Sequence, residues 1–226
     1  MTSKRVLITG ATGFVGSRLL DRVQADGYSV TAAVRQSAGD LDVPVFRMGD
    51  LSAGQDWSAA LAGQDVVIHC AARVHVMAET AADPLAAFRE VNVNATLNLA
   101  RQAAAAGVRR FIFLSSIKVN GELTEPGRPF TSHDLPSPAD PYAVSKAEAE
   151  AGLLQLVKQT GMELVIIRPV LVYGPGVKGN FQRMMVWVKR GRVLPLGAVD
   201  NRRSLVALDN LVDLVATCVD HPAAAG

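Results

Sequence analysis

The stretch Val6-Leu7-Ile8-Thr9-Gly10-Ala11-Thr12-Gly13-Phe14-Val15-Gly16 decides the fold of this 226-residue chain. A short apolar run ends in glycines spaced G-x-x-G-x-x-G, and Val15, Leu19 and Val23 then recur every four residues, which predicts a strand, a tight turn and a helix. Side chains in place of these glycines would block a pyrophosphate from the helix N-terminus, where unpaired N–H groups and the helix dipole favour an anion. The motif therefore predicts a dinucleotide site formed by Gly10, Thr12, Gly13, Phe14, Val15 and Gly16.

Apolar runs and helical patterns alternate through the rest of the first 169 residues. Each run is short and continuous, as expected of strands buried on both faces, and the further runs lie at 30–34, 66–68, 111–114 and 164–167. Long helices are predicted at about Pro84–Ala106 and Pro141–Thr160, with Asp83 and Asp140 as their N-caps. This alternation predicts an α/β fold of the Rossmann type, a doubly wound parallel sheet with helices on both faces.

The composition of the sequence changes after Arg168-Pro169, where proline and glycine become frequent. A helix over about 180–190, a short strand near 204–206 and a helix over about 209–220 are predicted there. We interpret residues 1–169 as a dinucleotide-binding domain and residues 170–226 as a small, partial substrate-binding lobe.

Composition narrows the class of protein. Apolar residues make up 49% of the chain and charged residues 19%, with a net charge of +2, which suits a globular domain and gives no reason to expect nucleic acid. Cys70 and Cys218 lack metal-ligand spacing and predict neither a metal site nor a disulfide framework. Because no secretory signal or membrane-spanning run is visible, we expect a cytoplasmic protein without a membrane partner.

The end of the second predicted strand bears on the choice of cofactor. An acidic residue that binds a ribose 2′-hydroxyl belongs about 20 residues after the glycine loop. Val34 occupies that place and Arg35 follows it, so a guanidinium is available to bind a 2′-phosphate. We therefore favour NADP(H) over NAD(H), with a solvated surface arginine as the alternative. Asp50-Leu51, after a third strand expected between the runs at 30–34 and 66–68, is expected to touch the adenine unless Asp50 is only a turn residue.

A candidate catalytic group lies in Tyr142-Ala143-Val144-Ser145-Lys146, where a phenol and an ammonium four residues apart share one helix face. A lysine cation stabilises a phenolate and lowers the tyrosine pKa, which acid-base catalysis near neutral pH needs. Ser115-Ser116 ends the preceding strand at the edge where such sheets bind ligands, although strand-end capping would explain the serines alone.

In this order and spacing, the glycine loop, Ser115-Ser116 and Tyr142-x-x-x-Lys146 resemble an extended short-chain dehydrogenase/reductase, and the chain is similar to the NAD-dependent epimerase/dehydratase family typified by UDP-galactose 4-epimerase. The resemblance covers essentially the whole chain and includes His69-Cys70-Ala71-Ala72, Val91-Asn92-Val93-Asn94-Ala95-Thr96, Arg168-Pro169, Tyr173-Gly174-Pro175-Gly176 and Arg203-Ser204-Leu205-Val206. It implies a catalytic hydroxyl at Ser116, an acid-base at Tyr142, and at Lys146 a residue that lowers the tyrosine pKa and holds the nicotinamide ribose. It also implies cofactor contacts from Ala71, Ala72, Asn92, Ser115, Tyr142, Lys146 and Pro169, and substrate contacts from Ser116, Lys118, Asn180 and Arg203.

Three segments depart from the usual family pattern. Ile117-Lys118-Val119-Asn120 replaces a common Ala-Thr-Val-Tyr-like run, so the sugar pocket is expected to differ. Val34-Arg35 resembles NADPH-dependent ketone reductases of the dihydroflavonol type. Ala72-Arg73-Val74-His75-Val76-Met77 resembles the subset that reduces UDP-4-keto-6-deoxy-N-acetylhexosamines.

The resemblance implies hydride transfer between a nicotinamide and C4 of a UDP-linked sugar, in a 4-keto reductase or a 4-epimerase. Two alternatives remain, a non-catalytic dinucleotide sensor and a reductase of a small ketone without a nucleotide. The intact Ser116, Tyr142 and Lys146 weigh against the first, and Asn180 and Arg203 weigh against the second.

The resemblance also bears on assembly and on the last residues. Helices beginning near Pro84 and Pro141 resemble those that form a four-helix dimer interface in the family, so a homodimer is expected. Family members run about one hundred residues further, so we expect a truncated lobe that leaves the apolar face of 211–219 uncovered.

Overall fold

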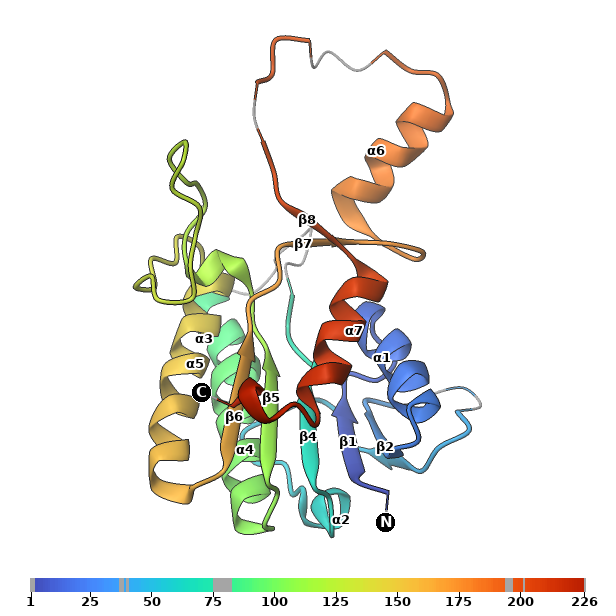
Figure 1. Cartoon of the computed structure of the whole chain (residues 1–226), viewed down its shortest axis with the longest axis vertical. Helices are drawn as coiled ribbons and strands as arrows, with labels where there is room; N and C mark the ends of the chain where they lie inside the picture. The colour runs from blue at the N-terminus through green and yellow to red at the C-terminus, as the bar shows by residue number, and fades with distance from the viewer. Residues whose placement is uncertain are drawn as a thin grey trace.

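A six-stranded parallel sheet forms the centre of the computed structural model, which describes residues 3–36, 39, 41–74, 83–193, 197–200 and 202–225 (Figure 1). In chain order the strands are β1 (Arg5–Thr9), β2 (Ser29–Val34), β3 (Val45–Arg47), β4 (Val66–His69), β5 (Arg110–Leu114) and β6 (Glu163–Ile167). They lie side by side in the order β3-β2-β1-β4-β5-β6, and every neighbouring pair is parallel. This is the doubly wound Rossmann order, with its reversal between β1 and β4, and it confirms the predicted fold class.

Helices cover both faces of the sheet. One face carries α1 (Phe14–Ala25) and α7 (Leu208–Cys218), whose apolar side chains form one buried cluster with β1, β2 and β4. The other face carries α2 (Ser58–Leu61), α4 (Ala95–Ala105) and α5 (Pro141–Thr160), which pack around Phe111 and Phe113 of β5. Because both faces are covered, the strands are almost fully apolar, as the continuous runs predicted.

The two long predicted helices begin where their capping residues indicate. The Asp83 carboxylate accepts a hydrogen bond from the Ala86 N–H at 3.0 Å, and the Asp140 carboxylate accepts one from Ala143 N–H at 2.8 Å. The first helix is not uniform: α3 (Pro84–Arg89) continues through a π-helical turn, η1 (Glu90–Asn94), into α4. A π-turn shifts the helical register by one residue and often marks a functional site, a feature that the 3.6-residue period did not predict.

The chain after Pro169 leaves the main sheet and then returns to it. Two short strands, β7 (Leu171–Tyr173) and β8 (Leu205–Ala207), pair in parallel beside α6 (Gly179–Lys189). Strand β7 was not predicted, whereas α6, β8 and α7 were. Two short 3₁₀ turns, η2 (Ile117–Val119) and η3 (Pro222–Ala224), complete the elements.

The prediction that the apolar face of residues 211–219 is uncovered is wrong. Leu211, Val212, Val215, Ala216 and Val219 are each at most 4% exposed, because α7 lies against α1 and the sheet. The buried Arg110 side chain anchors the end of this helix through hydrogen bonds to the carbonyl oxygens of Cys218 at 2.6 Å and His221 at 3.1 Å.

The exposed apolar helix is instead α6, which contains no buried residue. It stands away from the sheet beyond β7 (Figure 1), and Met185, Trp187 and Val188 are 46–57% exposed. Among the residues that the structure describes, no helix combines the length and apolar character needed to span a bilayer.

Candidate active site

The glycine loop follows β1 and leads into α1 at the carboxyl edge of the sheet. Gly10 has φ +68°, and a Cβ there would lie 2.8 Å from the backbone nitrogen of Ala71. A Cβ on Gly16 would lie 2.1 Å from the Gly10 carbonyl oxygen, so only glycine lets α1 approach β1 this closely, as predicted. Gly13 precedes α1 without a side-chain cap, which leaves the first-turn N–H groups of α1 available to an anion.

The loop after β4 is held against the glycine loop by a buried hydrogen-bond chain. The Thr9 hydroxyl bonds His69 Nδ1 at 2.7 Å, and His69 Nε2 bonds the Thr96 hydroxyl at 2.9 Å. Thr9 Oγ1 also accepts a hydrogen bond from the Ala71 N–H at 3.3 Å, which places Ala71 beside Gly10. Burial lowers the pKa of His69 to about 3, so the ring is neutral and structural, a role that the sequence did not reveal.

Asn92, in the π-helical turn, connects the same loop to α5. Its side-chain amide donates to the Arg73 carbonyl and to Ser145 Oγ, both at 3.0 Å, and its oxygen accepts from Arg73 N–H at 2.8 Å. Ser145 Oγ in turn donates to the Tyr142 carbonyl at 2.7 Å. The predicted cofactor residue Asn92 therefore fixes the backbone on both sides of the site.

Lys146 reaches the end of β5 from α5. Its ammonium donates to the Leu114 carbonyl at 2.9 Å and lies 4.4 Å from the centre of the Phe113 ring. The side chain is 2% exposed, and burial lowers the pKa of Lys146 to about 8, although Cys70 and Glu150 act to raise it. The structure therefore brings Lys146 of α5 to the end of β5, the strand that Ser115-Ser116 follow.

Tyr142 lies on the first turn of α5, with its ring edge-on to Phe88 at 6.0 Å. Burial and the Asp140 carboxylate raise the pKa of Tyr142 to about 12. The expected lowering by Lys146 is absent from the described structure, where the lysine ammonium is bound to the Leu114 carbonyl. The phenol is therefore protonated at neutral pH and has a proton to donate.

Ser115 and Ser116 follow β5 but face different partners. Ser115 is buried, and its hydroxyl donates to the Glu150 carboxylate. Ser116 is half-buried and begins η2, where its hydroxyl oxygen accepts from the Lys118 N–H at 3.3 Å. Ile117 N–H donates to the Pro169 carbonyl at 3.0 Å, so the segments after β5 and β6 are joined at this edge.

The residues of the glycine loop and of the expected adenosine end differ in exposure. Val34 is buried in the core, whereas Arg35 is 73% exposed and its guanidinium lies 3.9 Å from the Asp50 carboxylate. Leu51 is half-buried against the apolar cluster on the α4 face. Thr12 is exposed, while Phe14 and Val15 are half-buried against the cluster beneath α1.

The predicted substrate residues are spread more widely. Lys118 forms an ion pair with Asp140, the N-cap of α5. Asn180 and Arg203 are exposed beyond Pro169, and neither side chain makes a hydrogen bond or ion pair with a described residue. In Ala72-Arg73-Val74-His75-Val76-Met77, which resembles the deoxysugar reductases, residues 75–77 lie outside the described part of the chain.

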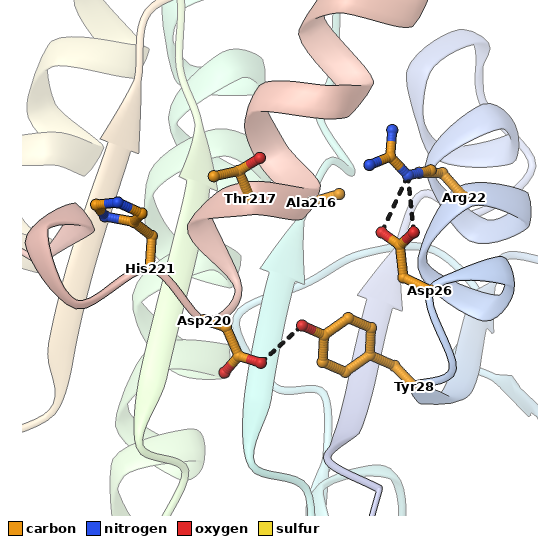
Figure 2. A pocket seen from close by; sticks show the side chains of 7 residues that line it. All are labelled: Arg22, Asp26, Tyr28, Ala216, Thr217, Asp220 and His221. Carbon is orange, nitrogen blue, oxygen red and sulfur yellow. Dashed lines mark hydrogen bonds and ion pairs between the residues drawn. The ribbon is translucent and has the colours of Figure 1, made fainter.

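A pocket of about 360 Å³, whose lining side chains are drawn in Figure 2, contains none of these residues. Arg22 and Asp26 line it from α1, Asp220 lines it after α7, and Tyr28 directly precedes β2, so it opens at the amino edge of the sheet. Tyr28 and Asp220 are hydrogen bonded at 2.7 Å. Within the described ranges, no cluster of histidine, cysteine and acidic residues is arranged to hold a metal.

This fold and site define a dinucleotide-dependent enzyme of the short-chain dehydrogenase/reductase class, and residues 6–226 match the family described as "NAD dependent epimerase/dehydratase family". The chain belongs to that family. It is 51% identical over 224 residues to a UDP-glucose 4-epimerase of Vibrio cholerae, a match that covers 98% of this chain and 68% of the relative.

Two solved structures are similar in fold over more than nine-tenths of the chain. A UDP-N-acetylglucosamine 4-epimerase of Methanobrevibacter ruminantium, in complex with UDP-N-acetylmuramic acid, is 26% identical with a TM-score of 0.79, and the match covers 94% of this chain and 72% of that one. DesIV, a dTDP-glucose 4,6-dehydratase of Streptomyces venezuelae with NAD and TYD bound, is 28% identical with a TM-score of 0.80. This match covers 95% of this chain and 71% of that one. The chain thus spans about two thirds to three quarters of the lengths of these proteins.

Proposed function

We propose that this chain binds a nicotinamide dinucleotide across the glycine loop and interconverts UDP-hexoses by inverting C4. The observation that carries the proposal is the buried Lys146 at the end of β5, four residues after Tyr142 and at the same sheet edge as the glycine loop. The 51% identity to a protein named UDP-glucose 4-epimerase favours an epimerase over a 4-keto reductase.

The residues at this edge fit a dinucleotide. Any side chain at Gly10 or Gly16 would collide with backbone, and the uncapped start of α1 presents N–H groups where a pyrophosphate would lie. Ala71 and Ala72 follow β4 with small side chains, and Lys146 and Pro169 follow along the same edge toward the nicotinamide end. When bound, the nicotinamide ring supplies a reversible hydride acceptor.

In the proposed reaction Tyr142 handles the proton on the sugar 4-oxygen while the C4 hydrogen leaves as hydride. The oxygen gives its proton to Tyr142 and the carbon gives up a hydride, so a 4-keto sugar forms. When hydride returns to the opposite face of C4 and the oxygen regains its proton from Tyr142, the centre is inverted. Ser116 would hold the reacting oxygen by a hydrogen bond. Lys146 would bind the nicotinamide ribose. To favour the tyrosinate as well, its ammonium would have to leave the Leu114 carbonyl, and its charge would then offset the burial and the Asp140 charge that raise the pKa of Tyr142.

The proposal is tested by incubating the chain and NAD⁺ or NADP⁺ with UDP-glucose or UDP-galactose and separating the products. The same equilibrium mixture should be reached from both sides. Tyr142→Phe should keep dinucleotide affinity and lose turnover roughly 10²–10⁴-fold, as for a lost general acid-base. Tyr28→Phe, at the opposite edge of the sheet, is the matched control and should turn over normally. Undiminished turnover in Tyr142→Phe would remove this residue from the mechanism.

The finer cofactor preference is proposed as NADP(H) over NAD(H). Val34 is buried, so the residue exposed at the end of β2 is the Arg35 guanidinium. Its pairing with Asp50 is weak because both side chains are largely in solvent, which leaves Arg35 able to bind a 2′-phosphate.

A homodimer through the helical layer formed by α3 and α5 is proposed from the family resemblance. Leu154 of α5 is 46% exposed, and Arg89 of α3 pairs with Glu148 of α5, so the two helices form one continuous surface. Sedimentation velocity at micromolar concentration should show a dimer, and a monomer alone would contradict this proposal.

A further inference from the structure

Glu150 is a buried carboxylate for which the reaction chemistry above has no role. It lies on α5 one helical turn after Lys146, and Glu150 is only 2% exposed. Both carboxylate oxygens accept hydrogen bonds from Arg168, at 2.5–3.1 Å, and one of them also accepts the Ser115 hydroxyl. A carboxylate this deeply buried is stable only when such partners satisfy it.

Through these partners Glu150 reaches both ends of the segment that carries Ser116. Ser115 precedes Ser116, and Asn120 ends the η2 turn that Ser116 begins. Arg168 Nη1 donates to the Asn120 side-chain oxygen at 3.0 Å, and the Asn120 amide donates to the Thr131 carbonyl at 3.0 Å. The Glu150–Arg168 pair therefore clamps this segment between α5 and the residues that follow β6.

The same carboxylate also supplies charge to the site. The buried Lys146 ammonium lies near two titratable groups at the end of β4, His69 and Cys70. His69 is neutral, and burial keeps Cys70 protonated by raising its pKa to about 12. Among the residues that the structure describes, the titratable and charged groups around Lys146 are His69 at the end of β4, Cys70 directly after it, Tyr142 and Glu150 one turn before and after Lys146 on α5, and Arg168 after β6, bound to Glu150. Glu150 is the carboxylate of this set.

We propose that Glu150 is a positioning residue of the active site, which fixes the Ser115–Asn120 segment through Arg168 and supplies the buried negative charge that keeps Lys146 protonated. The proposal rests on the proposed function only in taking Lys146 and Ser116 as site residues. It assigns Glu150 no contact with substrate or cofactor.

The test is a direct titration of Lys146 in protein labelled with ¹³C at the lysine Cε, followed by NMR, with Lys146→Met used to assign the signal. In wild type the signal should titrate near pH 8. Glu150→Gln removes the charge but keeps the side-chain shape, and should lower this midpoint by about one unit or more. Glu148→Gln is the matched control, because Glu148 lies on the same helix and pairs with Arg89 away from the site, and its variant should leave the Lys146 midpoint unchanged.

Turnover of UDP-glucose provides the second readout: Glu150→Gln should lower kcat at pH 7 more than it changes KM. If the epimerase activity is absent from wild type as well, the lysine titration still decides the role of Glu150. The double variant Glu150→Gln/Arg168→Gln removes both buried charges and guards against misfolding of the single variant. A Lys146 midpoint within about 0.3 pH units of wild type in a folded Glu150→Gln protein would overturn the proposal. The double variant loses the clamp but keeps the net buried charge, so an unchanged kcat in a folded double variant would overturn it as well.

Discussion

Gly16→Ala tests how closely α1 must approach β1 to form the dinucleotide site. The added Cβ would lie 2.1 Å from the Gly10 carbonyl oxygen, so α1 or the loop must move by roughly 1 Å to restore an ordinary contact. Alanine favours a helix over glycine by about 1 kcal/mol, which offsets part of an overpacking cost of about 1–3 kcal/mol. The variant should therefore fold, with little change or a modest loss in stability.

Dinucleotide affinity should fall much more than stability. Moving the start of α1 breaks at least one charge-assisted hydrogen bond to the pyrophosphate, worth about 1.5–3 kcal/mol, which is roughly a 10- to 150-fold increase in Kd. Calorimetric titration of wild type and variant with NADPH and NADH measures the change, and thermal unfolding confirms that the variant is folded.

Gly152→Ala is the matched control for this substitution. Gly152 also lies inside a helix, but its added Cβ would meet only the flexible end of the Leu97 side chain at 2.8 Å. Its dinucleotide affinity should equal that of wild type. If a folded Gly16→Ala protein binds dinucleotide as tightly as Gly152→Ala, the glycine loop does not form the pyrophosphate site.

Three further predictions concern the cofactor, a buried charge and the placement of α7. Arg35→Ala should weaken NADPH binding roughly fivefold and leave NADH binding unchanged, because the arginine is exposed; equal losses for both cofactors in the calorimeter would refute the preference. Lys146 has a folded pKa of about 8, below its ordinary 10.5, so between these pH values the unfolded chain retains a proton that the folded chain has released, and stability must rise with pH. Between pH 7 and pH 10 this rise is worth about 2.5 kcal/mol in urea unfolding. Lys146→Met should remove it, and an unchanged rise would contradict the argument. Arg110→Met should cost about 1.5–3 kcal/mol in the same measurement because α7 loses its anchor, whereas Arg109→Met, which removes a half-exposed partner of Glu163, should cost less.

Local sequence signals predicted the features that depend on neighbouring residues. Continuous apolar runs identified five of the six strands because a strand covered on both faces needs apolar side chains throughout. Asp83 and Asp140, each followed by proline, predicted the starts of two helices, and both carboxylates do accept N-terminal backbone N–H groups. The collision that a Cβ on Gly16 would cause is likewise a local consequence of the strand-to-helix turn.

Features that depend on tertiary contacts were not predictable in the same way. The face that α7 covers is decided by α1 and by Arg110, more than 80 residues earlier in the chain, so its burial was missed. The roles of Glu150 and Arg168 arise only when α5 and β6 lie side by side, and the one local signal was that Glu150 follows Lys146 by a helical turn. The π-turn at Glu90–Asn94 has no signature in a regular apolar period.

The proposed inversion at C4 is tested most directly by following the hydrogen on that carbon. UDP-glucose carrying deuterium at C4 is incubated in ordinary water with the chain and its bound dinucleotide, and the UDP-galactose formed is analysed by NMR and mass spectrometry. The proposed function predicts that the product keeps the deuterium at C4, because hydride leaves and returns without exchange with water. Loss of the deuterium to solvent, or the absence of UDP-galactose from protein that binds dinucleotide, would contradict it.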